Sequence, residues 1–340
     1  MRLIEKVWFK NHRAKYWLLP LLLPLTALFY LLSSVRRLAF KLHILASCKV
    51  TKPVIIVGNI GVGGNGKTPV VIHLVELLKT QGFKPGVISR GYGGKAEHYP
   101  YLLDERSTTK EAGDEPILIF KRCKTPVVVG ADRVANAKLL IKQGCDVIIS
   151  DDGLQHYRLQ RDVELVIVDG NRLFGNNFLL PAGPLREGTW RLQQADLTIY
   201  NVSQPSNCDA FSENSLLMTL AAKELVNIKT GEKAAVANFI KNRQLVNAIA
   251  GIGDPQRFFN TLQLLGFKLH EYKGFIDHKD FLLDDFQAFK NDLPLLMTEK
   301  DAVKCQVFAK DNWWYLPVDA QFSTQNEQAL LQCLQNKILT

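Results

Sequence analysis

The loop Gly61–Thr68 reads Gly-Val-Gly-Gly-Asn-Gly-Lys-Thr and fits the phosphate-binding pattern G-x-x-x-x-G-K-[ST]. Glycines let backbone N–H groups turn inward around phosphate oxygens, and a following helix adds the positive end of its dipole. Lys67 is expected to reach the β- and γ-phosphates, and the Thr68 hydroxyl to bind Mg²⁺. The residues of this predicted nucleoside triphosphate site are Gly61, Val62, Gly63, Gly64, Asn65, Gly66, Lys67 and Thr68.

Two neighbouring carboxylates, Asp151 and Asp152, follow an apolar stretch at 146–150. An acid at the end of such a strand is the Walker-B-type group that helps hold Mg²⁺ in P-loop proteins. One carboxylate can orient the ligands of the metal ion while the other faces water or substrate. We therefore predict a metal-binding or catalytic role for this pair.

Three further places carry residues whose types suit either phosphoryl transfer or an ordinary structural role. Arg90 and Tyr92, in a glycine-rich turn, suit an anionic or sugar substrate as well as a surface turn. Asp114, which we expect in a loop before an apolar run, suits a general base and a helix cap equally. Arg133, at the start of a helix, suits phosphate binding or a surface salt bridge.

The segments that must position these residues alternate between strand and helix. Buried strands are predicted over 54–57, 84–89, 126–130, 146–150 and 163–169, with helices over 70–79 and 134–142. This alternation over 53–200 predicts an α/β fold of the P-loop NTPase type with a doubly wound parallel sheet. A strand, turn and helix start over 248–255, and strands over 268–272 and 294–298 with a helix between, predict a smaller C-terminal α/β domain. The polar stretch 203–215 is predicted to be a loop.

The positive charge of the chain is concentrated at its N-terminus. Of the 42 Lys and Arg and the 33 Asp and Glu, nine basic residues and one acidic residue lie in 1–50, so 33 basic and 32 acidic residues remain. A nearly neutral remainder disfavours a nucleic-acid partner. The six cysteines form no C-x-x-C pair, which indicates reduced thiols in a cytosolic compartment and disfavours a zinc site.

Residues 16–32 carry no charge and reach the short end of the length range for a membrane-spanning helix. Pro20 and Pro24 lie within this stretch, aromatic residues edge it, and basic residues lie on both sides. This arrangement fits an interfacial or hairpin-like anchor at least as well as a single pass. A buried core helix is the alternative, but the basic cluster favours an anchor that contacts anionic lipids.

Taken in order, these motifs resemble the tetraacyldisaccharide 4′-kinase family, the lipid A kinases of Gram-negative bacteria. The resemblance extends from the N-terminal anchor to about residue 310. It is carried by the sequences GNGKTP at 64–69, SRGYG at 89–93, GDEP at 113–116, DDGLQH at 151–156, PAGPLRE at 181–187 and TEKD at 298–301.

The resemblance implies transfer of the γ-phosphoryl group of ATP, with Mg²⁺, to the 4′-hydroxyl of an acylated glucosamine disaccharide 1-phosphate, giving lipid IVA. It also implies a place on the cytoplasmic face of the bacterial inner membrane, with no nucleic acid and no obligate protein partner. Asp114 would pair with His278 as the catalytic base, and closure of two domains around ATP would complete the site. Many family members carry a second histidine where this chain has Lys279, so His278 is the assigned residue.

The same resemblance assigns the remaining roles. The implied catalytic residues are Asp114, His278, Lys67, Asp152 and Arg133, and the implied metal ligands are Thr68, Asp151 and Asp152. The implied substrate-binding residues are Arg90, Tyr92, His156, Arg186 and Glu187. We expect an anchor over 1–45, a P-loop nucleotide-binding kinase domain over 46–235 and a smaller α/β domain over 236–340.

Two other classes of P-loop protein fit less well. A membrane-tethered, dimerising nucleotide switch would carry a lysine early in its loop, but 61–65 contain none, and no Asn-Lys-x-Asp guanine motif occurs. An ATPase coupled to transport would need C-terminal membrane segments or an ABC signature, and neither is found in the sequence. The kinase interpretation is therefore preferred.

Overall fold

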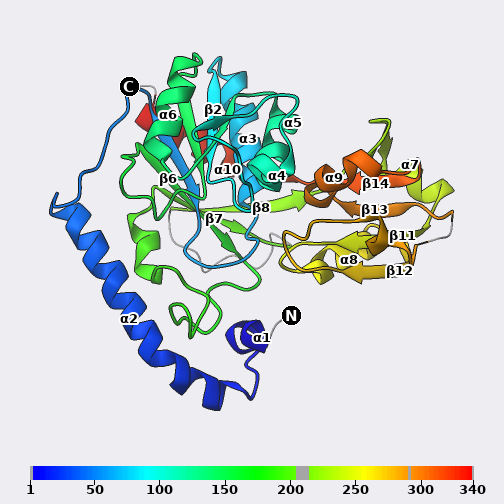
Figure 1. Ribbon diagram of the computed structural model, residues 1–340, viewed down its shortest axis with the longest axis horizontal. Coiled ribbons are helices and arrows are strands. Elements are labelled where there is room, and N and C mark those ends of the chain that lie inside the picture. Colours follow the sequence, from blue (N-terminus) through cyan, green and yellow to red (C-terminus); the bar gives the residue numbers. More distant parts are fainter. Residues whose placement is uncertain (1–2, 204–213, 290–291, 339–340) are drawn as a thin grey trace. The chain divides into compact units, whose positions relative to one another are not determined.

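A computed structural model describes residues 3–203, 214–289 and 292–338, which fall into two compact units (Figure 1). One unit comprises Met1–Arg90, Thr125–Leu220 and Ala320–Thr340, and the other comprises Gly91–Lys124 and Ala221–Asp319. This division differs from the predicted boundary at 235/236. The segment Gly91–Lys124 joins the C-terminal part because its helix α5 (Asp114–Cys123) packs against α9 (Glu299–Cys305).

The first unit is built on a sheet in which the order of strands is β15-β8-β7-β6-β1-β5-β2-β4. All neighbouring pairs from β8 to β4 are parallel, which confirms the predicted parallel α/β fold. The strands are β1 (Val54–Gly58), β2 (Pro85–Ser89), β4 (Val127–Val129), β5 (Val147–Asp151), β6 (Val163–Asp169), β7 (Leu197–Asn201), β8 (Ser215–Ala221) and β15 (Asp319–Phe322). Strands β1 and β6 are buried along their whole length, as expected for Val- and Ile-rich strands with both faces covered.

Helices α3 (Lys67–Thr80) and α6 (Arg133–Lys142) pack against the central strands and match the predicted helices. Asp132 caps α6, since its side chain accepts hydrogen bonds from two backbone N–H groups of the first turn. The C-terminal helix α10 (Thr324–Ile338) also belongs to this unit. The predicted loop over 203–215 lies largely outside the described residues.

The N-terminus forms two helices, α1 (Leu3–Phe9) and α2 (Lys15–Lys41). Figure 1 shows α2 as one long helix that lies apart from the strands of its own unit. It passes through Pro20 and Pro24 and extends well beyond the predicted apolar stretch. By length and composition it could cross a membrane: its most apolar 18-residue window has a mean hydropathy of 2.0, and only 6% of that window is buried. A buried core helix is therefore excluded.

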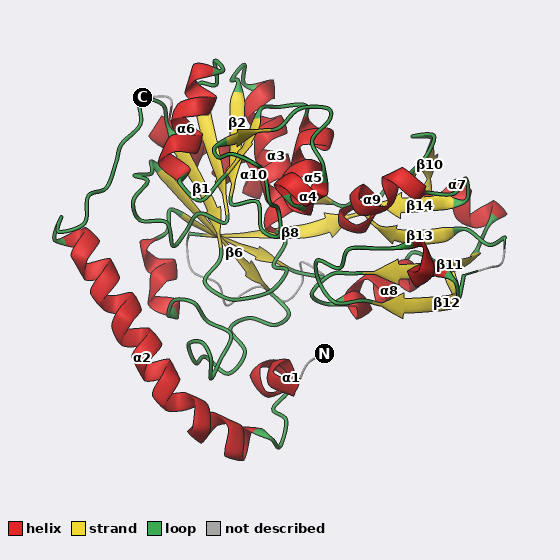
Figure 2. Cartoon of the chain, in the orientation of Figure 1, coloured by secondary structure: helices red, strands yellow, loops and turns green. Residues whose placement is uncertain are grey.

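The second unit contains a mixed sheet with strand order β10-β9-β14-β13-β11-β12. Strands β11 to β14 are mutually parallel, β9 is antiparallel to both of its neighbours, and α8 lies against β11 and β12 (Figure 2). The strands of this sheet are β9 (Glu224–Asn227), β10 (Lys233–Ala235), β11 (Leu245–Ala250), β12 (Lys268–Gly274), β13 (Leu295–Thr298) and β14 (Trp313–Leu316). Besides α5 and α9, the helices of this unit are α4 (Thr109–Ala112), α7 (Val236–Asn242) and α8 (Pro255–Leu264). A short strand, β3, covers Tyr101–Leu102.

This arrangement confirms the predicted smaller α/β domain in outline. The helix predicted between 268–272 and 294–298 is wrong, because the described residues there contain only a 3₁₀ turn at Leu283–Phe286. The parallel strands β11, β12 and β13 end at the same edge, so the loops that follow them gather there.

Candidate active site

The glycine loop and the paired carboxylates lie at the same edge of the first sheet. Strand β1 leads into the loop, β5 ends at Asp151, and Val57 stands directly beside Asp151 in the parallel register. The carboxyl ends of neighbouring parallel strands are where α/β folds bind ligands. The topology therefore brings together the two strongest sequence signals.

Gly66 is the glycine on which the shape of the loop depends. It immediately precedes α3 with φ +94°, a left-handed conformation that side chains disfavour. A Cβ atom there would lie 2.7 Å from Asn201 Nδ2 and 2.9 Å from Met218 Cε. Asn201 also donates a hydrogen bond of 3.2 Å to the carbonyl oxygen of Asn65. Neighbouring side chains thus hold the loop in a form that only glycine allows.

We expect Gly66→Ala to weaken ATP binding by roughly 5–30-fold, because the left-handed conformation alone costs an alanine roughly 1–2 kcal/mol. Equilibrium binding of ATP, followed by calorimetry, tests this expectation. Gly82→Ala is the matched control, since Gly82 also has φ +85° but has open space around its Cβ position. The control should lower thermal stability and leave ATP affinity unchanged. Equal ATP affinity in both variants would contradict the expectation.

Asp152 lies between two cations. Its Oδ1 is 3.4 Å from Lys67 Nζ, and its carboxylate accepts hydrogen bonds of 3.2–3.3 Å from Arg186 Nη1. Burial raises the pKa of Asp152, but the charges of Lys67 and Arg186 outweigh burial and hold the pKa below its ordinary value. Asp152 also has φ +49°, and such strained backbone gathers at functional sites. The three predicted site residues therefore form one ionised cluster.

Arg133 is almost fully buried, at 3% exposure, next to the carboxylates. Its Nη2 donates a hydrogen bond of 2.8 Å to the carbonyl oxygen of Asp151, whereas its Nη1 makes no hydrogen bond within the part of the chain that the structure describes. Burial lowers the pKa of Arg133 to about 10, and the charges of Asp151 and Asp152 oppose this effect. A buried guanidinium with spare donors is suited to an anionic ligand.

Glu187, predicted to bind substrate, is 2% exposed and contacts side chains of its own unit. It accepts hydrogen bonds from the Tyr157 hydroxyl and from Gln155 Nε2, the latter at 3.2 Å. Arg37 and Arg191 lie 3.7 and 3.8 Å from its oxygens. Through these contacts Glu187 links helix α2 to the loop that carries Arg186. Its substrate-binding role stays a prediction.

Two other predicted substrate-binding residues lie in the same unit. Arg90 is exposed at the end of β2, and its charge contributes to lowering the pKa of Arg133. His156 is half-buried, and burial lowers its pKa below the ordinary value, which favours a neutral imidazole. Neither position tests its predicted role.

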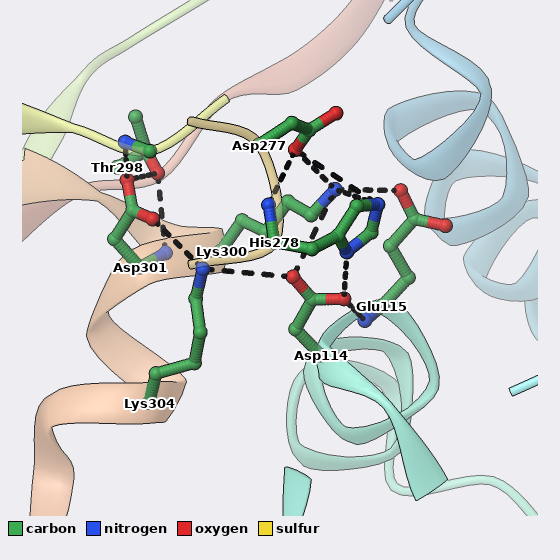
Figure 3. A network of polar contacts seen from close by, with 9 residues as sticks. Asp114, Glu115, Asp277, His278, Thr298, Lys300, Asp301 and Lys304 are labelled. Carbon is green, nitrogen blue, oxygen red and sulfur yellow. Dashed lines mark hydrogen bonds and ion pairs between the residues drawn. The ribbon is translucent and has the colours of Figure 1, made fainter. Parts of the chain in front are cut away.

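Asp114 and His278 lie in the second unit and contact each other directly (Figure 3). Asp114 is the first residue of α5 rather than a loop residue, and His278 follows β12 with φ +58°. His278 Nδ1 is 3.1 Å from Asp114 Oδ1, and the Tyr92 ring centroid is 5.0 Å from the imidazole centroid. Both residues belong to one compact unit, so their contact does not depend on closure between the two units.

The electrostatics of this pair favour a charged carboxylate. Burial raises the pKa of Asp114, but the hydrogen bond with His278 and the charges of Lys300 and Lys304 outweigh burial and hold the pKa below its ordinary value. The hydrogen bond with Asp114 raises the pKa of His278 above its ordinary value, against burial and the charge of Lys300. The two groups thus titrate as a coupled pair.

Lys300 and Lys304, both on α9, face this pair and had no predicted role. Lys300 Nζ lies 3.1 Å from Glu115 Oε1, 3.3 Å from Asp277 Oδ1 and 3.4 Å from His278 Nε2. The sequence does carry a signal, since two lysines four residues apart share one helix face. The sequence does not indicate that these two lysines face helix α5.

Among the described residues, no group of three or more His, Cys, Asp or Glu side chains is arranged to hold a metal ion. The predicted ligands Thr68, Asp151 and Asp152 supply only oxygen donors at the edge of the sheet. Mg²⁺ commonly binds through one or two carboxylates together with substrate phosphates and water. The residues present therefore fit Mg²⁺ that arrives with a nucleotide.

Comparisons with known proteins identify the family of this chain. The family described as LpxK, tetraacyldisaccharide-1-P 4′-kinase, matches residues 18–338. A tetraacyldisaccharide 4′-kinase of Colwellia psychrerythraea is 62% identical over 97% of this chain and 96% of its own length, and one of Vibrio vulnificus is 50% identical over the same shares. The crystal structure of "apo" form LpxK from Aquifex aeolicus in complex with ATP is 28% identical, has a TM-score of 0.78, and covers 94% of this chain and 99% of that one. The chain therefore belongs to the tetraacyldisaccharide 4′-kinase family.

Proposed function

We propose that this kinase transfers the γ-phosphoryl group of Mg²⁺-bound ATP to the 4′-hydroxyl of an acylated glucosamine disaccharide 1-phosphate at the cytoplasmic face of the inner membrane. The observation that carries the proposal is the part-buried contact between Asp114 and His278 in a chain that also holds a complete phosphate-binding loop. A loop alone fits any nucleotide-hydrolysing protein. A carboxylate–imidazole pair adds a group that can take a proton from a hydroxyl.

The chemistry divides between positioning and proton removal. The 4′-oxygen forms a bond to the γ-phosphorus, the bond from that phosphorus to the β,γ-bridging oxygen breaks, and ADP leaves with its electrons. Lys67 and Arg133 offset the negative charge that develops on the phosphoryl oxygens. The pair of Asp114 and His278 takes the proton of the hydroxyl. Thr68 and Asp151 or Asp152 would hold Mg²⁺, which would supply further charge neutralisation when bound.

The proposed membrane location rests on α2 and on its attachment to the site. Thr26, a buried polar residue of α2, donates to the carbonyl oxygen of Leu179 at 3.4 Å and accepts from the Ala182 N–H at 3.0 Å. Trp8 Nε1 donates to the carbonyl oxygen of Pro181 at 3.2 Å. The same loop continues to Arg186, which contacts Asp152. An anchor joined to the site in this way would hold the nucleotide loop close to a lipid substrate.

The exposed leucines of α2 offer a test of membrane attachment in the full chain. We expect the double substitution Leu21→Asp, Leu28→Asp to move much of the protein from anionic phospholipid vesicles into the soluble fraction, because each acid costs roughly 2.5–3.5 kcal/mol in the middle of a membrane helix. Leu264→Asp is the control, since Leu264 is 88% exposed on α8 and far from α2 in sequence. Unchanged sedimentation of the double variant with vesicles would refute the anchor.

The decisive test of the activity is an assay with γ-labelled ATP and acylated disaccharide 1-phosphate in detergent micelles. We expect Mg²⁺-dependent label on the lipid, attached at the 4′-oxygen. Release of inorganic phosphate without labelled lipid would instead favour an ATPase or nucleotide switch. The lipid lacking a free 4′-hydroxyl serves as the control substrate and should remain unlabelled.

A further inference from the structure

Asp301 is a fixed, fully buried carboxylate at the start of α9, with 0% exposure. It accepts hydrogen bonds from the N–H of Gly251, at 2.9 Å, and from the Thr298 hydroxyl, at 2.6 Å. Gly251 directly follows β11, and Thr298 is the last residue of β13. These contacts tie Asp301 to the carboxyl ends of two neighbouring strands.

Lys304 lies one helical turn beyond Asp301 and points toward Asp114 (Figure 3). Its Nζ is 3.1 Å from Asp301 Oδ1 and 3.7 Å from Asp114 Oδ2, and its side chain is only 5% exposed. The ammonium group also lies 5.1 Å from the centroid of the Phe281 ring. A fixed carboxylate and an aromatic ring thus hold a buried cation against the proposed base.

These charges depend on one another. Asp114 Oδ2, Asp301 Oδ1 and Lys304 Nζ are all buried and make no hydrogen bond among the described residues. Ion pairing is therefore the compensation available to each atom for the loss of hydration. Removing one partner from such a group leaves an uncompensated buried charge, which is strongly unfavourable. The ammonium group of Lys304 is consequently held between Asp301 and Asp114.

The two oxygens of Asp114 have different neighbours. Oδ1 contacts His278 Nδ1, whereas Oδ2 faces the ammonium groups of Lys304, at 3.7 Å, and Lys300, at 3.8 Å. We propose that Lys304, fixed by Asp301, is a positioning residue that holds the Asp114 carboxylate ionised and directs Oδ1 toward His278. This inference rests on the proposed role of the Asp114–His278 pair as the base.

Lys300 is less suited to this role. Its side chain is 16% exposed, and its ammonium group is closer to Glu115 and Asp277 than to Asp114. Lys304 has no acidic partner besides Asp114 and Asp301 among the ion pairs of the described residues. Its charge is therefore shared between Asp301, which fixes it, and Asp114.

The expected direction of the effect follows from the charges around Asp114. The titratable groups that face it are Glu115 on its own helix, Asp277 and His278 on the loop after β12, and Lys300, Asp301 and Lys304 on α9. Loss of the Lys304 cation makes the pair bind its proton more tightly. A more tightly held proton moves the acid limb of the kcat/KM profile to higher pH.

The test compares Lys304→Met, Lys304→Arg and Lys229→Met in the full chain, using kcat/KM for the lipid substrate across pH. We expect Lys304→Met to move the acid limb upward by about one pH unit or more, since an opposite charge within ~4–6 Å shifts a pKa by ~1–3 units. Lys304→Arg should restore most of the profile. Lys229→Met removes an exposed ion pair to Asp311 and should leave the profile unchanged.

Stability is separated from positioning by the double variant Lys304→Met, Asp301→Asn, which removes the buried cation and its anchor together. If it folds, as judged by thermal unfolding, it should show a smaller upward shift than Lys304→Met, because loss of the Asp301 anion offsets part of the effect of losing the Lys304 cation. A uniform loss of activity with an unmoved acid limb in folded Lys304→Met would overturn the inference and leave the proposed function intact. Full activity in Asp114→Asn would instead overturn the proposed base.

Discussion

Lys67→Ala is expected to lower kcat/KM by about 10²–10³-fold, the usual loss when one preorganised group that stabilises transition-state charge is removed. Lys67 is the first residue of α3 and directly follows Gly66, which has a left-handed backbone conformation. Its side chain therefore starts where the glycine loop meets the helix. Its ammonium group lies 3.4 Å from Asp152 Oδ1, and its side chain is only 14% exposed. No other lysine occurs in the loop to replace it.

The variant should remain folded, because Asp152 keeps its contact with Arg186 when Lys67 is lost. Lys79→Ala is the matched control, since Lys79 belongs to the same helix and forms an ion pair with the exposed Glu76. Rates of phosphoryl transfer and thermal unfolding should be measured for both variants. Near-normal transfer by Lys67→Ala would remove the phosphate-binding loop from the mechanism, whereas parallel losses in both variants would indicate a folding defect.

The nucleotide half of the site was predictable because its signals are local. A Val- and Ile-rich strand, a glycine loop and a helix follow one another in β1 and α3, and a second apolar strand ends in Asp151. Parallel strands place their carboxyl ends at one edge, so strand prediction was sufficient to place both motifs. Lys67 of the first motif and Asp152 of the second therefore lie close enough to form an ion pair.

The other half depends on contacts between distant parts of the chain. The helix that begins at Asp114 packs against α9, and Lys300 bonds to Glu115 across 185 positions of sequence. No pattern within 91–124 indicates which later segment covers it. The same limitation explains why Lys304 had no predicted role and why the grouping of Asp114 with the C-terminal segment was not predicted. Periodicity reports that a face is buried, but it does not identify the partner.

The N-terminal helix shows a different limitation. The sequence placed the apolar stretch correctly, but α2 passes through Pro20 and Pro24 and includes Arg36 and Arg37. Membrane helices tolerate proline, because neighbouring groups satisfy the freed backbone. Arg37 extends from the end of this helix to Glu187, a contact that no local pattern encodes. Helix length and attachment therefore required the structure.

Asp114→Asn is expected to lower kcat by about 10²–10⁴-fold, the usual contribution of a general base. The amide keeps the shape of the side chain but carries no charge. In the unmodified protein, kcat/KM should fall as pH drops through the apparent pKa of the pair, because a protonated pair cannot accept the hydroxyl proton. The Asp114 hydrogen bond raises the pKa of His278, so this acid limb should lie above the ordinary histidine value of 6.5.

Removing the carboxylate removes the largest cause of that raised pKa, and the nearby charge of Lys300 then favours a neutral imidazole. The residual activity of Asp114→Asn should therefore have its acid limb at lower pH, opposite in sign to the shift expected for Lys304→Met. His278→Ala should be slower at every pH and lose the histidine-controlled limb. Both profiles require only the same lipid assay. A residual acid limb that stays in place in Asp114→Asn would mean that the two residues titrate independently, and the paired base would have to be abandoned.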